Sequence, residues 1–468
     1  MTQREIQHLY LRAGFGADIS LVNRSKGLER KALLDQLFAA SAHPTSLDIV
    51  TAYTSEEMQM PDRKDRTAQE KKLMREHERQ QERKLNLAWL NKMMSGADML
   101  NEKMTFFWHD HFACKDENAT HAQALNNIIR KYALGDFRQL LLAVSKEPAM
   151  LKYLNNQQNK KNAPNENFAR EVMELFTLGR GNYSEADIKS AARAFTGWGF
   201  DKDTMTFQFR DKQHDYGEKT FLGKTGNFNG DEVLRIITDQ KQCALFITDK
   251  IYRYFVNEKG NEERIATLAA DFYTGGYNIA ALMRTIFSAD WFYEDQNTGI
   301  RIKSPVELLA SLGRHFDPQF PHENILFLVQ RVLGQLLFNP PNVAGWPNGK
   351  EWIDSSSLIF RTNLGRKIID SSAIDTIPKP DDDKNPNEML RKEKRFELIE
   401  ARIDWEKMLK EFPASSDEEL IGKVGGYLLQ IDVPKNIRSK IKLDGLTAAQ
   451  KMKQICAELT SLPEYQLC

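Results

Sequence analysis

Residues 165–200 have the sequence NENFAREVMELFTLGRGNYSEADIKSAARAFTGWGF, which predicts two helices joined by a turn. Apolar residues of the first helix recur at a spacing of three to four and so share one face. They are Phe168, Val172, Leu175 and Phe176. Gly179 and Gly181 end this helix, and Ser184 with Asp187 three residues later forms a capping-box pattern that starts the next. The stretch therefore predicts an antiparallel helical hairpin.

The same helical spacing recurs between residues 85 and 337, so the surrounding body is predicted to be helical as well. One stretch departs from it. Met205 to Phe209 alternates polar and apolar residues, and Lys219 to Leu222 follows after a polar turn. Alternation is typical of strands, so these runs predict a hairpin near residues 205–222. The predicted fold class is mainly α, a multi-helix globular body with one small β-hairpin.

A change of composition marks a boundary late in the chain. Residues 377–387, IPKPDDDKNPN, have the Pro, Asp and Asn density of a linker. We therefore expect a main helical domain over 1–372, a linker over 373–387 and a C-terminal helical segment over 388–468 that packs on the main domain.

The charges of the chain balance, with 65 Lys and Arg against 65 Asp and Glu in 468 residues. This balance argues against nonspecific binding to nucleic acid. No apolar run is long enough for a transmembrane segment, and the opening MTQREIQ does not have the pattern of a leader. The chain as given is expected to be cytoplasmic, or periplasmic or secreted if a leader is missing. Its four widely spaced cysteines are expected to be free thiols.

Two segments contain candidate metal ligands, His109 and His111 in FFWHDHF and Glu171 and Glu174 in the first helix of the hairpin. The two glutamates are three residues apart and project together, as carboxylates that share a cation must. The two histidines diverge by about 200° on a regular helix, so they converge on one ion only if the chain leaves the helix there. The alternative is a helix end whose aromatic residues pack in the core.

Glu166 and Arg170 are candidate catalytic residues on the polar face of the same helix. Arg170 lies four residues from both Glu166 and Glu174 and pairs with either on a helix. The helical hairpin also brings Arg193 toward these carboxylates. A structural network of arginine and glutamate is therefore the rival of a metal site.

Two loops supply further candidates. His214 and Asp215 lie in the turn of the predicted β-hairpin, a position suited to an exposed general acid or base or to a metal ligand, although turn chemistry alone also explains the aspartate. Trp346 and Trp352 lie on the loop NPPNVAGWPNGKEW and are candidates for substrate binding by stacking. The alternative is that these indoles pin the loop to the core. The sequence contains no Walker loop, no G-x-S-x-G elbow and no H-E-x-x-H.

Taken in order, these segments resemble a bacterial family called domain of unknown function 1800 (DUF1800). The resemblance rests on QHLYLRAGFGA, EKMTFFWHDHFA, NENFAREVMELFTLG, YSEADIKSAARAFTGW, HDYGEKTFLG, KSPVELL, LGQLLFNPPNVAGWPNGKEWI and SLPEYQ. It implies a predominantly helical fold and no established activity. Many relatives look exported and are often encoded beside a sulfatase-like protein of a second uncharacterised family, which implies a protein partner or a shared pathway.

Two functions of different class follow. The first is a metal-dependent hydrolase or oxidoreductase in which the histidines and glutamates bind a divalent transition metal, Zn, Mn or Fe. The second is a noncatalytic helical scaffold or binding protein in which the same residues form internal ion pairs and the tryptophan loop is the recognition surface.

Overall fold

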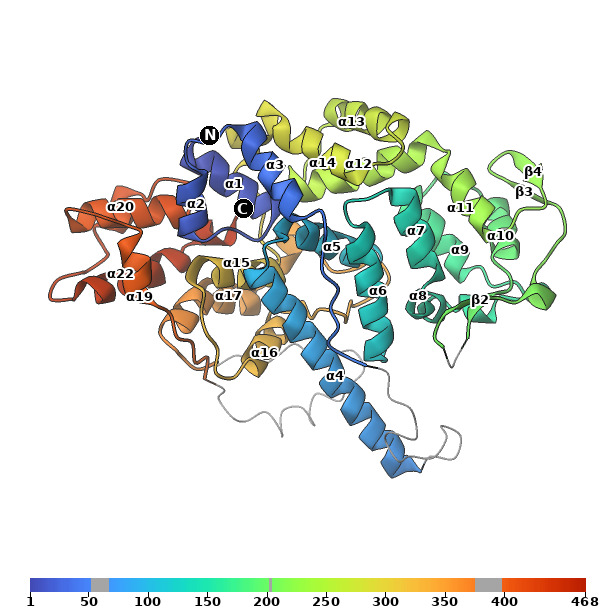
Figure 1. The fold of residues 1–468 in the computed structure, drawn as a ribbon, viewed down its shortest axis with the longest axis horizontal. Coiled ribbons are helices and arrows are strands. Elements are labelled where there is room, and N and C mark those ends of the chain that lie inside the picture. Colours follow the sequence, from blue (N-terminus) through green and yellow to red (C-terminus); the bar gives the residue numbers. More distant parts are fainter. Residues whose placement is uncertain (52–66, 202–203, 375–397) are drawn as a thin grey trace.

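The computed structural model describes residues 1–51, 67–201, 204–374 and 398–468, and helices make up most of them (Figure 1). The predicted mainly α fold is confirmed. Two helices form the centre, α5 (Met99–His111) and α15 (Pro305–Phe316). All of α15 and all of α5 except Asp110 are buried. Charged residues on these two helices must therefore find partners inside the protein.

The two ends of the chain lie side by side (Figure 1). Helix α1 (Gln3–Ala13) contacts α20 (Asp417–Leu428), and Gln3 Nε2 donates to the carbonyl oxygen of Gly426 at 3.1 Å. Helix α22 (Ala448–Thr460) packs on α17 (Ser355–Ile369). Residues 398–468 thus pack on the body, while the predicted linker over 373–387 lies outside the described residues from 375 onward.

The long helix α4 (Ala68–Ser95) projects from the body (Figure 1). It begins with a capping box of Thr67 and Glu70. Its first half carries charged residues that face solvent, whereas Leu85, Trp89 and Met93 in its second half are buried. Only the second half therefore contributes to the core.

The predicted helical hairpin of residues 165–200 forms, with one irregularity. Helix α9 (Asn167–Glu171) widens into the π-helical turn η2 (Val172–Thr177), and α10 (Glu185–Ala194) packs back against α9. Ser184 and Asp187 form the predicted capping box. The wide turn leaves main-chain carbonyl groups at the end of η2 available to other elements.

The strand pairing differs from the prediction. β2 (Phe207–Phe209) pairs with β1 (Trp198–Phe200), and β3 (Lys219–Phe221) pairs with β4 (Lys224–Gly226), both antiparallel. A single hairpin that joins Met205–Phe209 to Lys219–Leu222 is therefore wrong. The physical reason is that η3 (Asp211–Gln213) interrupts the chain after β2, and Arg210 N donates to Gly197 O at 2.7 Å beside β1.

The remaining elements complete the helical body. They are α2 (Ile19–Ser25), α3 (Arg30–Ala40), α6 (Ala119–Tyr132), α7 (Phe137–Lys146), α8 (Pro148–Tyr153), η1 (Asn156–Gln158), α11 (Gly230–Thr238), α12 (Lys241–Phe255), α13 (Glu262–Thr274), α14 (Ile279–Ser288), η4 (Asp290–Tyr293), η5 (Asp295–Asn297), α16 (Asn324–Leu333), η6 (Gly349–Trp352), α19 (Trp405–Lys410), α21 (Lys435–Arg438) and η7 (Pro463–Gln466). None of the described helices combines the length and the hydropathy needed to cross a membrane. The four cysteines are buried free thiols, as predicted.

Candidate functional site

His109 lies at the end of α5 inside a box of aromatic rings. Its ring centroid is 4.8 Å from that of Trp89 and 5.5 Å from that of Trp346. Its Nε2 accepts a hydrogen bond from the main-chain N–H of Phe338 at 3.2 Å. Burial, with a smaller effect of Arg130, lowers the pKa of His109 to about 3. His109 is therefore a neutral acceptor that fixes the start of the loop after residue 337.

His111 points to a different element, as the helical geometry of α5 requires. Its Nε2 donates to the main-chain oxygen of Phe176 at the end of η2, at 3.1 Å. Burial holds the pKa of His111 well below its usual value, with Lys250 adding to the effect. The histidine thus meets the carboxylate-bearing segment through a main-chain carbonyl of η2.

Asp110 lies between these histidines and anchors the tryptophan loop. It accepts a hydrogen bond from the main-chain N–H of Trp346 at 2.8 Å. Gly345 precedes that residue with φ of 89°, and a Cβ there would lie 2.8 Å from the main-chain oxygen of Asp110. Burial raises the pKa of Asp110 to about 6. The close approach of the loop to α5 therefore requires glycine.

Trp346 and Trp352 are each 5% exposed. Their indoles pin the loop to the core, which was the alternative to stacking on a substrate. These two rings therefore do not form an exposed surface, and a substrate-binding role for them stays a prediction.

The predicted catalytic pair Glu166 and Arg170 is part of an arginine and glutamate network. Arg170 donates to both carboxylate oxygens of Glu185 at 2.9 Å and to Glu166 at 3.2 Å. Glu185 lies in the first turn of α10, so this network ties the two helices of the hairpin together. Of the two pairings that the four-residue spacing allows, the one with Glu166 forms, whereas Glu174 pairs with Arg180.

Glu171 and Glu174, the predicted metal-binding pair, are placed differently from each other. Glu174 receives a hydrogen bond from Arg180 Nε at 2.5 Å and one from Tyr183 Oη at 3.1 Å. Glu171 is half-buried, and burial together with Glu174 raises its pKa. In the described parts of the chain, no group of three His, Cys, Asp or Glu side chains is arranged to hold a metal ion.

His214 and Asp215 also have structural partners. His214 is 2% exposed and donates through Nδ1 to the main-chain oxygen of Thr196 at 2.8 Å. Asp215 accepts from Arg193 Nε at 2.7 Å and from its Nη2 at 3.2 Å. These hydrogen bonds from Arg193 hold the pKa of Asp215 below its usual value. The expected exposure of His214 is wrong, because the turn folds back on the end of α10, and its role as a general acid or base stays a prediction.

This contact predicts a loss of stability in the variant Asp215→Asn. Arg193 is 34% exposed, so solvent screens the pair and we expect the free energy of unfolding to fall by only about 1 kcal/mol. Urea denaturation measures it, with Asp290→Asn as control, because Asp290 also pairs with an arginine, Arg30, but its side chain is 97% exposed. An unchanged stability of Asp215→Asn would show that Asp215 is not held as a structural residue.

A buried charge network at the centre was not predicted from the sequence. Lys103 of α5 and Arg301 both contact the carboxylate of Glu307 in α15. Tyr254 Oη donates to the same carboxylate at 3.2 Å, and Ser304 N does so at 2.8 Å. Burial opposes ionisation, yet the two cations hold the pKa of Glu307 well below its usual range. The signal in the sequence was a lysine and a glutamate within apolar runs, EKMTFFW and SPVELL.

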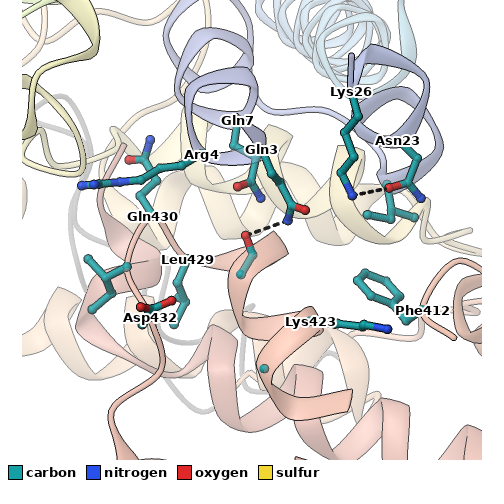
Figure 2. A pocket seen from close by; sticks show the side chains of 14 residues that line it. Gln3, Arg4, Gln7, Asn23, Lys26, Phe412, Lys423, Leu429, Gln430 and Asp432 are labelled. Carbon is teal, nitrogen blue, oxygen red and sulfur yellow. Dashed lines mark hydrogen bonds between the residues drawn. The ribbon is translucent and has the colours of Figure 1, made fainter. Parts of the chain in front are cut away.

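An open cleft lies between the two ends of the chain (Figure 2). It has a volume of about 640 Å³ and is lined by α1, the end of α2 and residues of α20 and the segment after it. Gln3 and Gln7 lie next to each other on one wall, and Phe412 and Lys423 lie across from them. Lys26, Asn23, Gln430 and Asp432 complete the polar lining. The sequence showed no motif here, because the walls come from residues 3–26 and 412–432.

The fold and these contacts define a mainly α-helical protein. Most of its polar motif residues form hydrogen bonds or ion pairs with other residues of the chain, and an open polar cleft lies where its two ends meet. The chain belongs to the family described as protein of unknown function (DUF1800), whose family model matches residues 8–467. No curated protein and no solved structure matches the chain.

Proposed function

We propose that this protein is a noncatalytic binding protein and that the cleft of Figure 2 takes an extended peptide segment of a protein partner. The observation that carries the proposal is the pair of amide side chains, Gln3 and Gln7, that line the cleft one helical turn apart. Each uses its Nε2 to donate to α20, through Gly426 O and Tyr427 O. Their amide oxygens accept no hydrogen bond from the described residues, so they remain for a ligand.

The spacing of these amides fits a peptide backbone. Residues four apart on a helix are separated by about 6 Å along its axis. Main-chain groups on the same side of an extended peptide repeat every two residues, about 6.6 Å. Two amide side chains at this helical spacing fit two N–H groups of one extended chain, and hydrogen bonds to the main chain are a general way to recognise a peptide without reading its side chains.

The charge of Lys26 favours an acidic residue of the peptide at its end of the cleft, because Asp432 lies at the other end (Figure 2). Arg4 pairs with Asp295 at 2.7 Å, and Lys423 pairs with Glu419 at 2.7 Å. The Nζ of Lys26 donates only to the neutral side chain of Asn23, at 2.8 Å, among the contacts of the described residues. Its charge is therefore available to a carboxylate of the ligand. The sulfatase-like protein that the family resemblance implies is the first partner to test.

The polar motif residues support a noncatalytic function. Glu166, Glu174 and Asp215 each form an ion pair with an arginine, which is a structural role. The arginines also lower the pKa of Glu174 and Asp215. A general base at neutral pH needs a pKa closer to 7. Elemental analysis of the protein purified without a histidine tag tests the rival enzyme. A stoichiometric transition metal that is lost in Glu174→Gln would overturn the noncatalytic proposal.

Binding is tested with a pool of random hexapeptides, with retained peptides identified by mass spectrometry. We expect retained peptides to be enriched in Asp and Glu, and Lys26→Glu and Gln3→Met to reduce their binding at least tenfold. Lys31→Glu is the matched control, because Lys31 is an exposed lysine of α3 outside the cleft. Equal retention by the wild type and by both cleft variants would contradict the proposal.

A further inference from the structure

A second cavity shares no lining residue with the cleft of Figure 2. Its volume is about 880 Å³, and it lies between α6, α7, the segment after α3 and the residues around β2. Its apolar lining includes Ile128, Pro148, Met205 and Phe207. This size is within the range of cavities that bind small molecules.

Glu147 is the carboxylate of this cavity. It lies at the junction of α7 and α8, where it ends one helix and precedes Pro148, the first residue of the next. Its side chain makes no capping hydrogen bond with α8. No ion pair or hydrogen bond of its carboxylate occurs within the described residues, although the residue is largely buried. Burial alone raises the pKa of Glu147 to about 7.

The positively charged residues of the cavity do not compensate Glu147. Lys146 pairs with Asp231 at 2.8 Å and lies 5.0 Å from the ring centroid of Phe207. Arg130 pairs with Glu102 at 2.7 Å and donates to Asn127 at 2.8 Å. The other two titratable groups of the lining, Lys131 and His43, are exposed. A carboxylate that is partly buried and has no partner among the described residues, beside Lys146 and Arg130 that pair elsewhere, suits a cationic ligand.

We propose that this cavity binds a small molecule with a primary ammonium group, which pairs with the Glu147 carboxylate while its apolar body lies against Ile128, Pro148 and Phe207. An ammonium group supplies both the charge and the hydrogen-bond donors that Glu147 lacks. The ammonium group binds the ionised form of the Glu147 carboxylate. At a pH near the pKa of Glu147 in the free protein, binding therefore releases a proton, and the affinity falls as the pH falls. This site is independent of the peptide cleft.

Isothermal titration with matched ligands tests the site in the full chain. The probes are phenylethylamine and hexylamine, each paired with the alcohol of the same shape, and a lysine side-chain mimic, Nα-acetyl-lysine methylamide. We expect at least one free amine to bind at least tenfold more tightly than its alcohol at pH 8, and to lose this preference at pH 5.5. Tighter binding of the lysine mimic than of both free amines would show that the ammonium comes from a protein, and would overturn the small-molecule assignment.

The variant Glu147→Gln separates this site from nonspecific binding, because glutamine keeps the volume and removes the charge. We expect it to abolish the preference for amines over alcohols, while Glu117→Gln, at an exposed glutamate outside the cavity, leaves the preference unchanged. Amines that bind no better than alcohols, or that bind Glu147→Gln as well as the wild type, would overturn the proposal. Thermal unfolding of each variant verifies that it is folded.

Discussion

Replacing Glu307 by glutamine is expected to lower the free energy of unfolding by about 3–5 kcal/mol, the usual cost of removing one partner from a buried ion pair. Glu307 is 2% exposed and is the shared partner of Lys103 and Arg301, which are 1% and 7% exposed in their side chains. Glutamine fits the same space but leaves both cations without a counter-charge. The expected loss of stability therefore reflects the cost of burying two cations without a counter-charge, which is larger than the loss of one hydrogen bond.

A matched control is available because Glu307 is also the third residue of a helix capping box. Glu232 has the same place in the capping box of α11, where Asn229 is the cap and the glutamate is only half-buried. Glutamine preserves a capping box, so Glu232→Gln is expected to change stability by less than about 1 kcal/mol. Urea denaturation of both variants measures the difference. Equal losses would mean that Glu307 acts only as a cap.

The features that the sequence predicted correctly depend on neighbouring residues. Helical spacing identified the hairpin of residues 165–200, and the Ser184 and Asp187 pattern placed the start of α10. The four-residue spacing from Glu166 to Arg170 predicted their ion pair. Each of these depends on contacts within one or two helical turns, where the sequence determines the geometry.

The features that were missed depend on residues far apart in the chain. The alternation of residues in β2 predicts a strand. It does not predict whether that strand pairs with the segment before it, which contains β1, or with the segment after it. The partner of His109 is the N–H of Phe338, 229 residues away, and that of Asp110 is the N–H of Trp346, 236 residues away. No spacing rule connects such positions, so the sequence did not indicate these partners. From the sequence the histidines resembled metal ligands, whereas in the structure their contacts are with the main chain and with aromatic rings.

The variant Glu147→Gln is expected to stabilise the free protein at high pH. In the unfolded chain Glu147 has its ordinary pKa of 4.5, whereas burial raises the value in the folded protein to about 7. Between these values the folded protein holds a proton that the unfolded chain has released, so the stability of the wild type falls as the pH rises. Above pH 7 the loss is complete. At about 1.4 kcal/mol per pH unit it reaches about 3 kcal/mol.

Glutamine at position 147 does not titrate, so the variant lacks this loss. We expect Glu147→Gln and the wild type to have similar stability at pH 4.5 and the variant to be more stable by about 2–3 kcal/mol at pH 8, measured by urea denaturation at both pH values. Glu117→Gln serves as the control for a glutamate exposed to solvent and should show no such dependence on pH. If the difference in stability between the variant and the wild type is the same at pH 4.5 and pH 8, the Glu147 carboxylate is not desolvated in the free protein. A difference that depends on pH requires a raised pKa of Glu147 in the folded protein.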